Sequence, residues 1–370
     1  MKITFVISSL SLGGAERVLI LLAQAFLNKG YQVTLVTFST KEDDFYTLPL
    51  NADRLALGIL GNSSSPLNAI INNLNRLSKL RKAICSTKPD IVISFATEIN
   101  ILTIISLLQT GIPVIGTEHC DPKLISYGKI WEKLRRFSYP YAKKIVSVSK
   151  GVDNGFEWLS TTKRAIIYNP FLKIEDHYSQ IDFPKGVYSD KQWIISMGRL
   201  TYQKGFDLLL SAFATIAHRY PNWQLIILGK GEQRSELEKL VEYLGLTDKV
   251  ILPGVIKNPF PILKKAEVFV MASRFEGFPM SHGEAMACGC PIISTDCPSG
   301  PREIVRHNID GILVPTGDVS ALAKAMDNLM SNEKERMRLA SRAKEVTERF
   351  SLTNVIDSWE RLFEAVIDKK

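Results

Sequence analysis

Long apolar runs and a dense set of cysteines are missing from this chain of 370 residues. No apolar run reaches the roughly 18–20 residues that a membrane-spanning helix needs. The N-terminal residues 1–7 are too short and too strand-like for a secretory signal peptide. The five cysteines are odd in number and scattered, which is typical of reduced thiols inside a cell. These absences predict a cytoplasmic protein without a membrane span.

A regular metal-ligand pattern is missing as well. Cys288, Cys290 and Cys297 lie near His282, and residues of these types can bind zinc. Their Cys-x-Cys spacing is unusual for zinc, however, and Cys288 falls in an expected helix, so small buried side chains are the better interpretation. We expect neither a metal nor an organic cofactor.

Positive charge, by contrast, is plentiful in the first half of the chain. Residues 1–185 contain 22 Lys and Arg against 15 Asp and Glu, whereas the remainder contains 24 against 23. This asymmetry predicts that the first half faces something anionic. Within it, residues 123–150 interleave eight Lys and Arg with five aromatic residues. A helix lying on an anionic bilayer and a solvated helix with core aromatics explain this stretch equally well, whereas no recognition motif supports nucleic acid.

Strand and helix patterns alternate twice along the chain. Apolar runs predict strands at 2–7, 33–38, 90–95, 113–117, 145–149 and 164–168, and again at 193–197, 224–228, 250–252, 268–272, 291–294 and 311–314. Helical patterns lie between them, so we expect an α/β protein with two Rossmann-like, doubly wound parallel sheets facing each other across a cleft. The expected parts are an N-terminal domain at 1–172, a linker at 173–191, a C-terminal domain at 192–351 and a terminal helix at about 352–368.

Two glutamates frame a possible anion-binding site in the second half. Glu276 is expected on a loop, because Gly-Phe-Pro follows it, and Glu284 in the first turns of a helix that begins near Ser281. A helix N-terminus presents free N–H groups and the positive end of the helix dipole. One carboxylate before the helix and one inside it suit a ligand with a central phosphate and hydroxyl-rich ends, such as a nucleotide sugar.

Two features of the first half are ambiguous by themselves. Gly13 and Gly14 open a helix after the first strand, but the third glycine of a dinucleotide-binding motif is absent. A tight turn without a ligand explains them equally well. His119 follows a strand at the sheet edge where such proteins bind ligands, although its position alone favours a loop histidine without a role.

Four motifs in register resemble the retaining glycosyltransferases of family 4, which have the GT-B fold. They are the turn at 13–16, Gly198-Arg199, Lys204-Gly205 with Asp207, and the pair Glu276 and Glu284. The resemblance covers essentially the whole chain, and it implies that the terminal helix at about 352–368 packs back on the N-terminal domain. Residues 297–304 are similar to bacterial members that extend surface glycans, some of which add N-acetylgalactosamine or galactose to acceptors linked to undecaprenyl pyrophosphate.

The resemblance implies roles for individual residues. Arg199 and Lys204 resemble the pair that binds the donor pyrophosphate. The metal-binding motif Asp-x-Asp of the other common glycosyltransferase fold is absent, so these cations and the helix N-terminus at Ser281 would take the place of a metal. Glu284 would bind the ribose hydroxyls and Glu276 the hydroxyls of the donor sugar. His119 resembles the family's histidine beside that sugar, which reverses the interpretation from position alone. The other implied donor-binding positions are Gly13, Gly14, Gly198, Gly254, Val255, Gly277, Phe278, Pro279, Met280 and Ser281.

The expected function is therefore a retaining, metal-independent hexosyltransferase with His119, Glu276, Arg199 and Lys204 as its catalytic set. It would move a hexose or N-acetylhexosamine from a UDP-sugar to a glycan or undecaprenyl-pyrophosphate-linked acceptor at the inner face of the cytoplasmic membrane, in bacterial surface polysaccharide or glycoconjugate synthesis. The leaving phosphate would assist deprotonation of the acceptor, and a Glu276 nucleophile is the alternative. Two other functions stay open: a nucleotide-sugar epimerase on the same fold and a basic membrane adaptor without catalysis.

Overall fold

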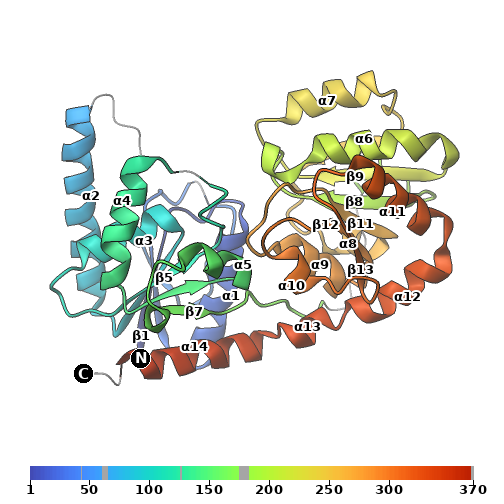
Figure 1. The fold of residues 1–370 in the computed structure, drawn as a ribbon. Helices are drawn as coiled ribbons and strands as arrows, with labels where there is room; N and C mark the ends of the chain where they lie inside the picture. The colour runs from blue at the N-terminus through green and yellow to red at the C-terminus, as the bar shows by residue number, and fades with distance from the viewer. Residues whose placement is uncertain (43, 61–65, 126, 175–182, 368–370) are drawn as a thin grey trace. The chain divides into compact units, whose positions relative to one another are not determined.

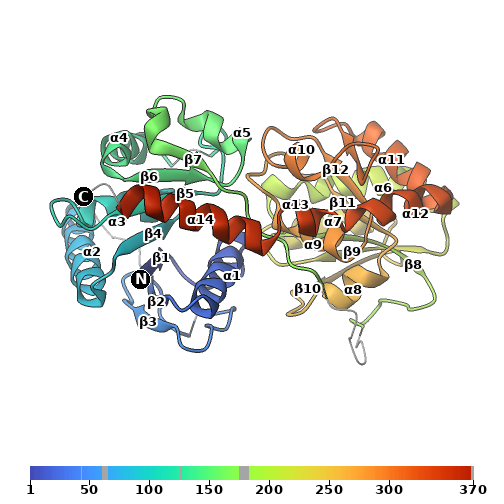
Figure 2. The ribbon, with the colours of Figure 1, turned by 90° about the horizontal axis from the view of Figure 1, so that it is seen from below.

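A computed structural model describes residues 1–42, 44–60, 66–125, 127–174 and 183–367 of the chain. Contacts divide the chain into two compact units (Figures 1 and 2), which we call unit 1 (residues 1–170 and 352–370) and unit 2 (residues 171–351). Part of the expected linker, residues 175–182, lies outside the described residues. The α/β class and the two parallel sheets are confirmed.

Unit 1 contains a parallel sheet of seven strands, in the order β3-β2-β1-β4-β5-β6-β7, within the described residues. The strands are β1 (Lys2–Ile7), β2 (Gln32–Thr37), β3 (Asp53–Ala56), β4 (Ile91–Phe95), β5 (Val114–Glu118), β6 (Lys144–Ser147) and β7 (Arg164–Ile166). Every residue of β4 and β5 is buried, as expected for central parallel strands covered on both faces. Strand β3 is not among the predicted strands, because it is short, begins with Asp53-Arg54 and is only partly buried at the sheet edge.

The helices of unit 1 follow its strands in alternation, as the sequence pattern predicts. They are α1 (Gly14–Asn28), α2 (Pro66–Thr87), α3 (Thr97–Ser106), α4 (Lys129–Ser138), α5 (Lys150–Asp153) and α14 (Leu352–Ile367), with the 3₁₀ turns η1 (Tyr139–Tyr141), η2 (Asn154–Phe156) and η3 (Thr161–Lys163). Helix α4 has its strongly basic end near the C-terminus, where Arg135 and Arg136 complement the helix dipole.

The last helix of the chain, α14, belongs to unit 1 and lies beside α1 (Figure 2). Its apolar stripe includes Trp359 and Phe363, and the Phe363 ring lies 5.5 Å from that of Phe26 on α1. At the polar rim, Glu360 accepts a hydrogen bond from the Lys29 ammonium at 2.6 Å and another from the Tyr31 hydroxyl at 2.8 Å. The core of unit 1 is therefore closed by the end of the chain.

Unit 2 contains a parallel sheet of six strands, in the order β10-β9-β8-β11-β12-β13, within the described residues. The strands are β8 (Gln192–Met197), β9 (Trp223–Leu228), β10 (Val250–Gly254), β11 (Val268–Met271), β12 (Ile292–Thr295) and β13 (Gly311–Val314). The helices are α6 (Phe206–Ile216), α7 (Arg234–Tyr243), α8 (Phe260–Lys265), α9 (Met280–Ala287), α10 (Pro301–Ile304), α11 (Val319–Ser331), α12 (Glu333–Ala343) and α13 (Val346–Arg349), with the 3₁₀ turns η4 (Tyr202–Lys204) and η5 (Ala217–Arg219).

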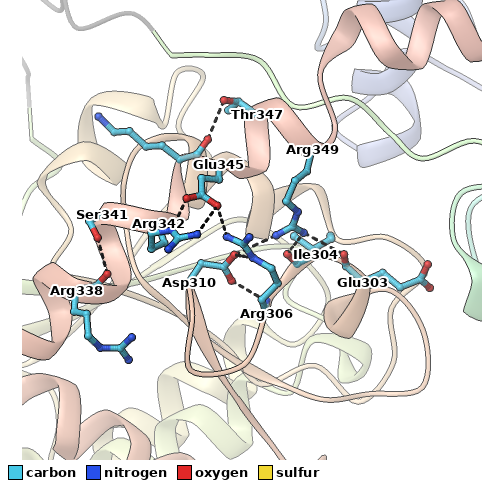
Figure 3. A network of polar contacts seen from close by, with 11 residues as sticks. Glu303, Ile304, Arg306, Asp310, Arg338, Ser341, Arg342, Glu345, Thr347 and Arg349 are labelled. Atoms are coloured by element: carbon cyan, nitrogen blue, oxygen red, sulfur yellow. Dashed lines mark hydrogen bonds and ion pairs between the residues drawn. The ribbon is translucent and has the colours of Figure 1, made fainter.

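A charged network ties α12 and α13 to the segment between α10 and β13 (Figure 3). At its centre, the fully buried carboxylate of Asp310 accepts hydrogen bonds from the guanidinium of Arg306 at 2.6 Å and of Arg349 at 3.1 Å. Arg306 also donates to Glu345 at 2.8 Å, in the short break between the two helices. This network fixes the last residues of unit 2 to the segment that precedes β13.

Candidate functional site

The sheet of unit 2 has its switch point between β8 and β11. The chain proceeds outward from β8 through β9 to β10, and in the other direction from β11 through β12 to β13. In open parallel sheets, ligands bind at the carboxyl ends of the strands beside such a switch point. Gly198 and Arg199 follow β8 directly, and Glu276 lies in the loop after β11. The fold thus brings two of the predicted motifs to the edge where a ligand is expected.

Lys204 and Glu276 form an ion pair at the carboxyl ends of these strands. The Lys204 ammonium donates to Glu276 Oε1 at 2.6 Å, and the Ser273 hydroxyl donates to the same oxygen at 2.6 Å. Only 14% of the Lys204 side chain and 6% of the Glu276 side chain is exposed. Gly205 permits the approach, because it adopts φ 62° and a Cβ there would lie 2.1 Å from the Ala272 carbonyl oxygen.

A second contact joins the same two segments and was not predicted from the sequence. The Arg274 guanidinium binds both carboxylate oxygens of Asp207 at 2.9 and 2.6 Å, and it lies 3.9 Å from the centre of the Tyr202 ring. The Arg274 amide also donates to the Gln203 carbonyl at 2.8 Å. The Lys204 turn and the Glu276 loop are therefore interlocked. Asp207, already noted in the Lys204-Gly205 motif, was the signal that could have revealed a partner.

Helix α9 carries the second predicted carboxylate. It begins at Met280 after the N-cap Pro279, so Met280 and Ser281 occupy its first turn, and Glu284 is buried within it. His282 on the same helix is fully buried, with Nε2 2.7 Å from the Ser294 hydroxyl. Burial lowers the pKa of His282 to about 3, with a further contribution from the nearby Lys204 cation, so the ring is neutral at physiological pH.

The remaining predicted positions of unit 2 also lie at or after the carboxyl ends of its strands. Gly254 is the last residue of β10, and Val255 follows it. The Arg199 side chain is exposed in the loop after β8. Gly277, Phe278 and Pro279 connect Glu276 to α9, and the Phe278 ring is buried. Their roles toward a donor stay predictions.

Unit 1 places the Gly13-Gly14 turn at its own switch point, between β1 and β4. Gly13 is the N-cap of α1, and a Cβ there would lie 2.1 Å from the Glu16 carboxylate. That carboxylate therefore lies against the helix N-terminus, where it complements the positive end of the helix dipole. Beside it, after β4, Ala96 adopts φ 74°, a strained backbone of the kind that concentrates at functional sites. No sequence signal marks Ala96.

His119 follows β5 in unit 1 and is held by two neighbours. Its ring stacks on Phe95 at 5.4 Å, and Nε2 lies 3.0 Å from the Thr117 hydroxyl. Burial lowers the pKa of His119 to about 4. At neutral pH the ring is therefore an uncharged hydrogen-bonding group rather than a cation.

The residue before His119 anchors a buried polar network. Glu118 accepts hydrogen bonds from the Thr97 hydroxyl at 2.9 Å, from the Asn100 amide at 3.2 Å and from the Tyr139 hydroxyl. Burial raises the pKa of Glu118, while these donors and the Arg135 cation oppose the rise. Arg135 lies near the end of α4, and Tyr139 lies in the 3₁₀ turn η1 that follows it. These contacts therefore connect the basic helix to the segment that carries His119. Sequence reasoning did not single out Glu118.

The basic stretch contains both core and surface aromatics. Tyr139 is fully buried, whereas Ile130, Phe137 and Tyr141 are 74%, 53% and 60% exposed. In the described part of the chain, no group of three or more His, Cys, Asp or Glu side chains is placed to hold a metal ion. Within the same residues, no helix has the length and apolar character needed to cross a membrane.

Two family models together match most of the chain. The model described as "Glycosyl transferases group 1" matches residues 178–346, and the model described as "Glycosyltransferase Family 4" matches residues 12–171. These ranges correspond closely to the two units.

Curated relatives match over almost the full length. The chain is 30% identical over 368 residues, 99% of each chain, to the GalNAc-alpha-(1->4)-GalNAc-alpha-(1->3)-diNAcBac-PP-undecaprenol alpha-1,4-N-acetyl-D-galactosaminyltransferase of Campylobacter jejuni. It is 28% identical over 356 residues, 93% of this chain and 94% of the relative, to the N-acetylgalactosamine-N,N'-diacetylbacillosaminyl-diphospho-undecaprenol 4-alpha-N-acetylgalactosaminyltransferase of the same organism.

Solved structures share the whole fold. HepE from Anabaena, solved in complex with UDP, has a TM-score of 0.76 at 18% identity and covers 99% of this chain and 100% of its own. TarM from S. aureus has a TM-score of 0.80 at 14% identity and covers 98% of both chains. The GT-B fold is confirmed by these likenesses.

Proposed function

The chain belongs to the family 4 glycosyltransferases, and we propose that it moves an N-acetylhexosamine from a UDP-sugar to a lipid-linked glycan in the synthesis of a bacterial surface glycan. The interlocked pair Lys204 and Glu276 at the switch point of unit 2 is the observation that carries the donor half of this proposal. The acceptor half rests on the two Campylobacter relatives, whose names specify undecaprenol-linked acceptors.

The donor site would use cations and helix dipole instead of a metal. Arg199 is exposed and Lys204 lies beside the carboxylate loop, so both can neutralise the negative charge that develops on a departing diphosphate. The amides of Met280 and Ser281, in the first turn of α9, would add hydrogen bonds to the phosphates. The ion pair places Lys204 and Glu276 side by side. Lys204 would therefore contact the diphosphate while the neighbouring Glu276 binds the sugar.

The proposed reaction retains the anomeric configuration. The bond between the sugar C1 and the diphosphate oxygen breaks, the bond between C1 and the acceptor oxygen forms on the same face, and the acceptor proton passes to the leaving phosphate. Glu276 suits a sugar-binding role better than that of a nucleophile. Two donors, Lys204 and Ser273, already stabilise the negative charge on its Oε1 and so reduce its reactivity.

The acceptor would be reached at the membrane through the exposed face of α4. Ile130 and Phe137 lie seven positions apart on one side of this helix, next to Lys129 and Lys133. An apolar patch beside cations suits the surface of an anionic bilayer. Vesicle co-sedimentation tests the contact: the double variant Ile130→Ser, Phe137→Ser should lose binding to vesicles containing phosphatidylglycerol, whereas Leu50→Ser, which changes another exposed side chain of unit 1, should bind normally.

A transfer assay tests the function itself. The purified protein is incubated with UDP-N-acetylgalactosamine and an undecaprenyl-diphosphate-linked oligosaccharide, with and without EDTA, and the product is analysed by mass spectrometry and by NMR of the new linkage. We expect an α-linked product from the α-linked donor at a rate that EDTA leaves unchanged. A β-linkage would contradict retention, and loss of activity with EDTA would contradict metal independence. A donor isomerised without acceptor would instead identify an epimerase.

A further inference from the structure

Three phenylalanine rings of unit 2 pack against one another beside the Glu276 loop. The rings of Phe171 and Phe278 are stacked, with centroids 5.6 Å apart and an interplanar angle of 12°. Phe350 meets both edge-on, at 5.9 Å from Phe171 and 5.3 Å from Phe278. All three side chains are buried, and aromatic pairs in such geometries are favourable beyond the area they bury. We call these residues the phenylalanine triad.

The members of the triad come from three distant places in the sequence. Phe171 is the first residue of unit 2, and Phe350 is the last but one. The Phe171 amide donates to the Phe350 carbonyl at 2.9 Å, so the two passages of the chain between the units run side by side here. Phe278, the third member, lies two residues after Glu276 on the loop that leads into α9.

Helix α9 is shaped to receive the Phe171 ring. A Cβ at position 283 would lie 2.2 Å from this ring, so only glycine leaves room for it. Glycine inside a helix costs about 1 kcal/mol relative to alanine, and such a residue usually has a packing or functional reason. The contact with Phe171 supplies a packing reason on the helix that carries Glu284.

Phe350 also contacts a residue of the charged network shown in Figure 3. The preceding residue, Arg349, has its guanidinium 5.0 Å from the centre of the Phe350 ring. That guanidinium donates to the buried Asp310 carboxylate at 3.1 Å and to the Glu303 carbonyl at 3.2 Å. The position of Phe350 is thus determined by contacts independent of the loop it supports.

We propose that Phe171 and Phe350 are positioning residues for the donor sugar, because they hold Phe278 and therefore the loop that places the Glu276 carboxylate. The inference rests on the proposed function and goes beyond it. It assigns a role in sugar recognition to Phe171 and Phe350, which lie where the chain enters and leaves unit 2. This role is separate from the binding of the nucleotide by Arg199, Lys204 and Glu284. Loosening the triad should free the Glu276 loop and weaken sugar recognition while UDP still binds.

The test uses Phe171→Leu and Phe350→Leu in the full chain, with Phe213→Leu as the matched control. Phe213 is equally buried, but it lies on α6 in the hydrophobic core of unit 2. Hydrogen exchange of the ligand-free protein should be faster in peptides covering residues 275–283 for the two triad variants and unchanged there for Phe213→Leu. Titration calorimetry should show UDP affinity within about threefold of wild type, because Arg199, Lys204 and Glu284 keep their contacts and only the Met280 and Ser281 amides are loosened. UDP-N-acetylgalactosamine affinity should fall about tenfold or more.

A second route to the same effect keeps all three phenylalanines and changes the helix that one of them packs against. Gly283→Ala should displace the Phe171 ring and reproduce the loss of sugar affinity. The double variant with Phe171→Leu should lose less than the two single losses combined, because both changes act on one contact. Equal weakening of UDP and UDP-sugar, or unchanged exchange at residues 275–283, would overturn the proposal. Wild-type protein that binds no UDP would refute the proposed function, and the exchange data would still decide whether the triad holds the loop.

Discussion

At the scale of single residues, the structure changes the meaning of several predicted side chains. Lys204 and Glu276 were assigned to different parts of a donor, yet they bind each other in the ligand-free protein. Arg135 belongs to a basic stretch, but its side chain is buried and supports the Glu118 network. Residue types and motif spacing could predict which residues gather at the site. They could not predict these pairings, since ion pairs such as Arg274 with Asp207 join segments 67 positions apart.

The first prediction concerns Lys204. Lys204→Ala should lower kcat/KM for transfer by about 10²–10³-fold, because it removes a charge that stabilises the leaving diphosphate. It should also destabilise unit 2 by about 1–3 kcal/mol, since the buried Glu276 loses a charged partner and keeps the Ser273 hydroxyl. Initial rates and urea unfolding measure the two effects. The exposed Lys324→Ala should change neither, and normal turnover of Lys204→Ala would rule out its role toward the diphosphate.

The second prediction is an acid-induced loss of stability from two histidines. The pKa values of His119 and His282 are lowered to about 4 and about 3 in the folded protein, whereas the unfolded side chains titrate near 6.5. Between these values the unfolded state binds more protons, so the free energy of unfolding should fall as the pH drops from 6.5 toward 4. Urea unfolding at pH 7.5 and pH 5 measures the difference. It should shrink in His119→Asn and persist in His218→Asn, which changes an exposed histidine.

At the scale of elements, alternation of apolar runs and turn residues predicted almost every strand and its order along the chain. Strand β3 was not predicted, because a four-residue edge strand with an acidic and a basic residue lacks an apolar pattern. The break at Lys344 and Glu345 was not predicted either, because the sequence pattern over 333–350 is that of one continuous helix. There the chain turns to place Glu345 against Arg306, a tertiary contact that helix propensity does not record.

The third prediction tests this charged network. Asp310→Asn keeps the shape of a fully buried side chain but removes the charge that Arg306 and Arg349 share. Unit 2 should lose about 1.5–3 kcal/mol of its free energy of unfolding, the range for hydrogen bonds to charged groups. Glu335→Gln removes a more exposed ion pair with Arg338 and should cost less than about 1 kcal/mol. Equal losses in the two variants would mean that the network contributes no more than surface charge.

At the scale of the whole molecule, the chain closes unit 1 with its last helix. The two-unit organisation could be predicted from the sequence because each unit repeats the strand–helix alternation. Only the family resemblance predicted that the terminal helix packs on the first unit. An amphipathic pattern shows that a helix has an apolar face, but it does not show which element covers that face. In the structure, α14 covers α1 through contacts such as that between Phe363 and Phe26.

The fourth prediction follows from this closure. Phe363→Ala should lower the free energy of unfolding of unit 1 by about 3–5 kcal/mol, the usual cost of removing a buried phenylalanine. Unit 2 makes up residues 171–351 and does not contain this side chain, so its stability should stay unchanged. Hydrogen exchange distinguishes the units, because peptides from β1, β4 and β5 should exchange faster while those from β8 and β11 keep their protection. Tyr243→Ala, at an 86% exposed position of α7, is the control and should alter neither unit. Faster exchange in unit 2 alone would show that α14 stabilises the molecule by a route other than its packing on α1.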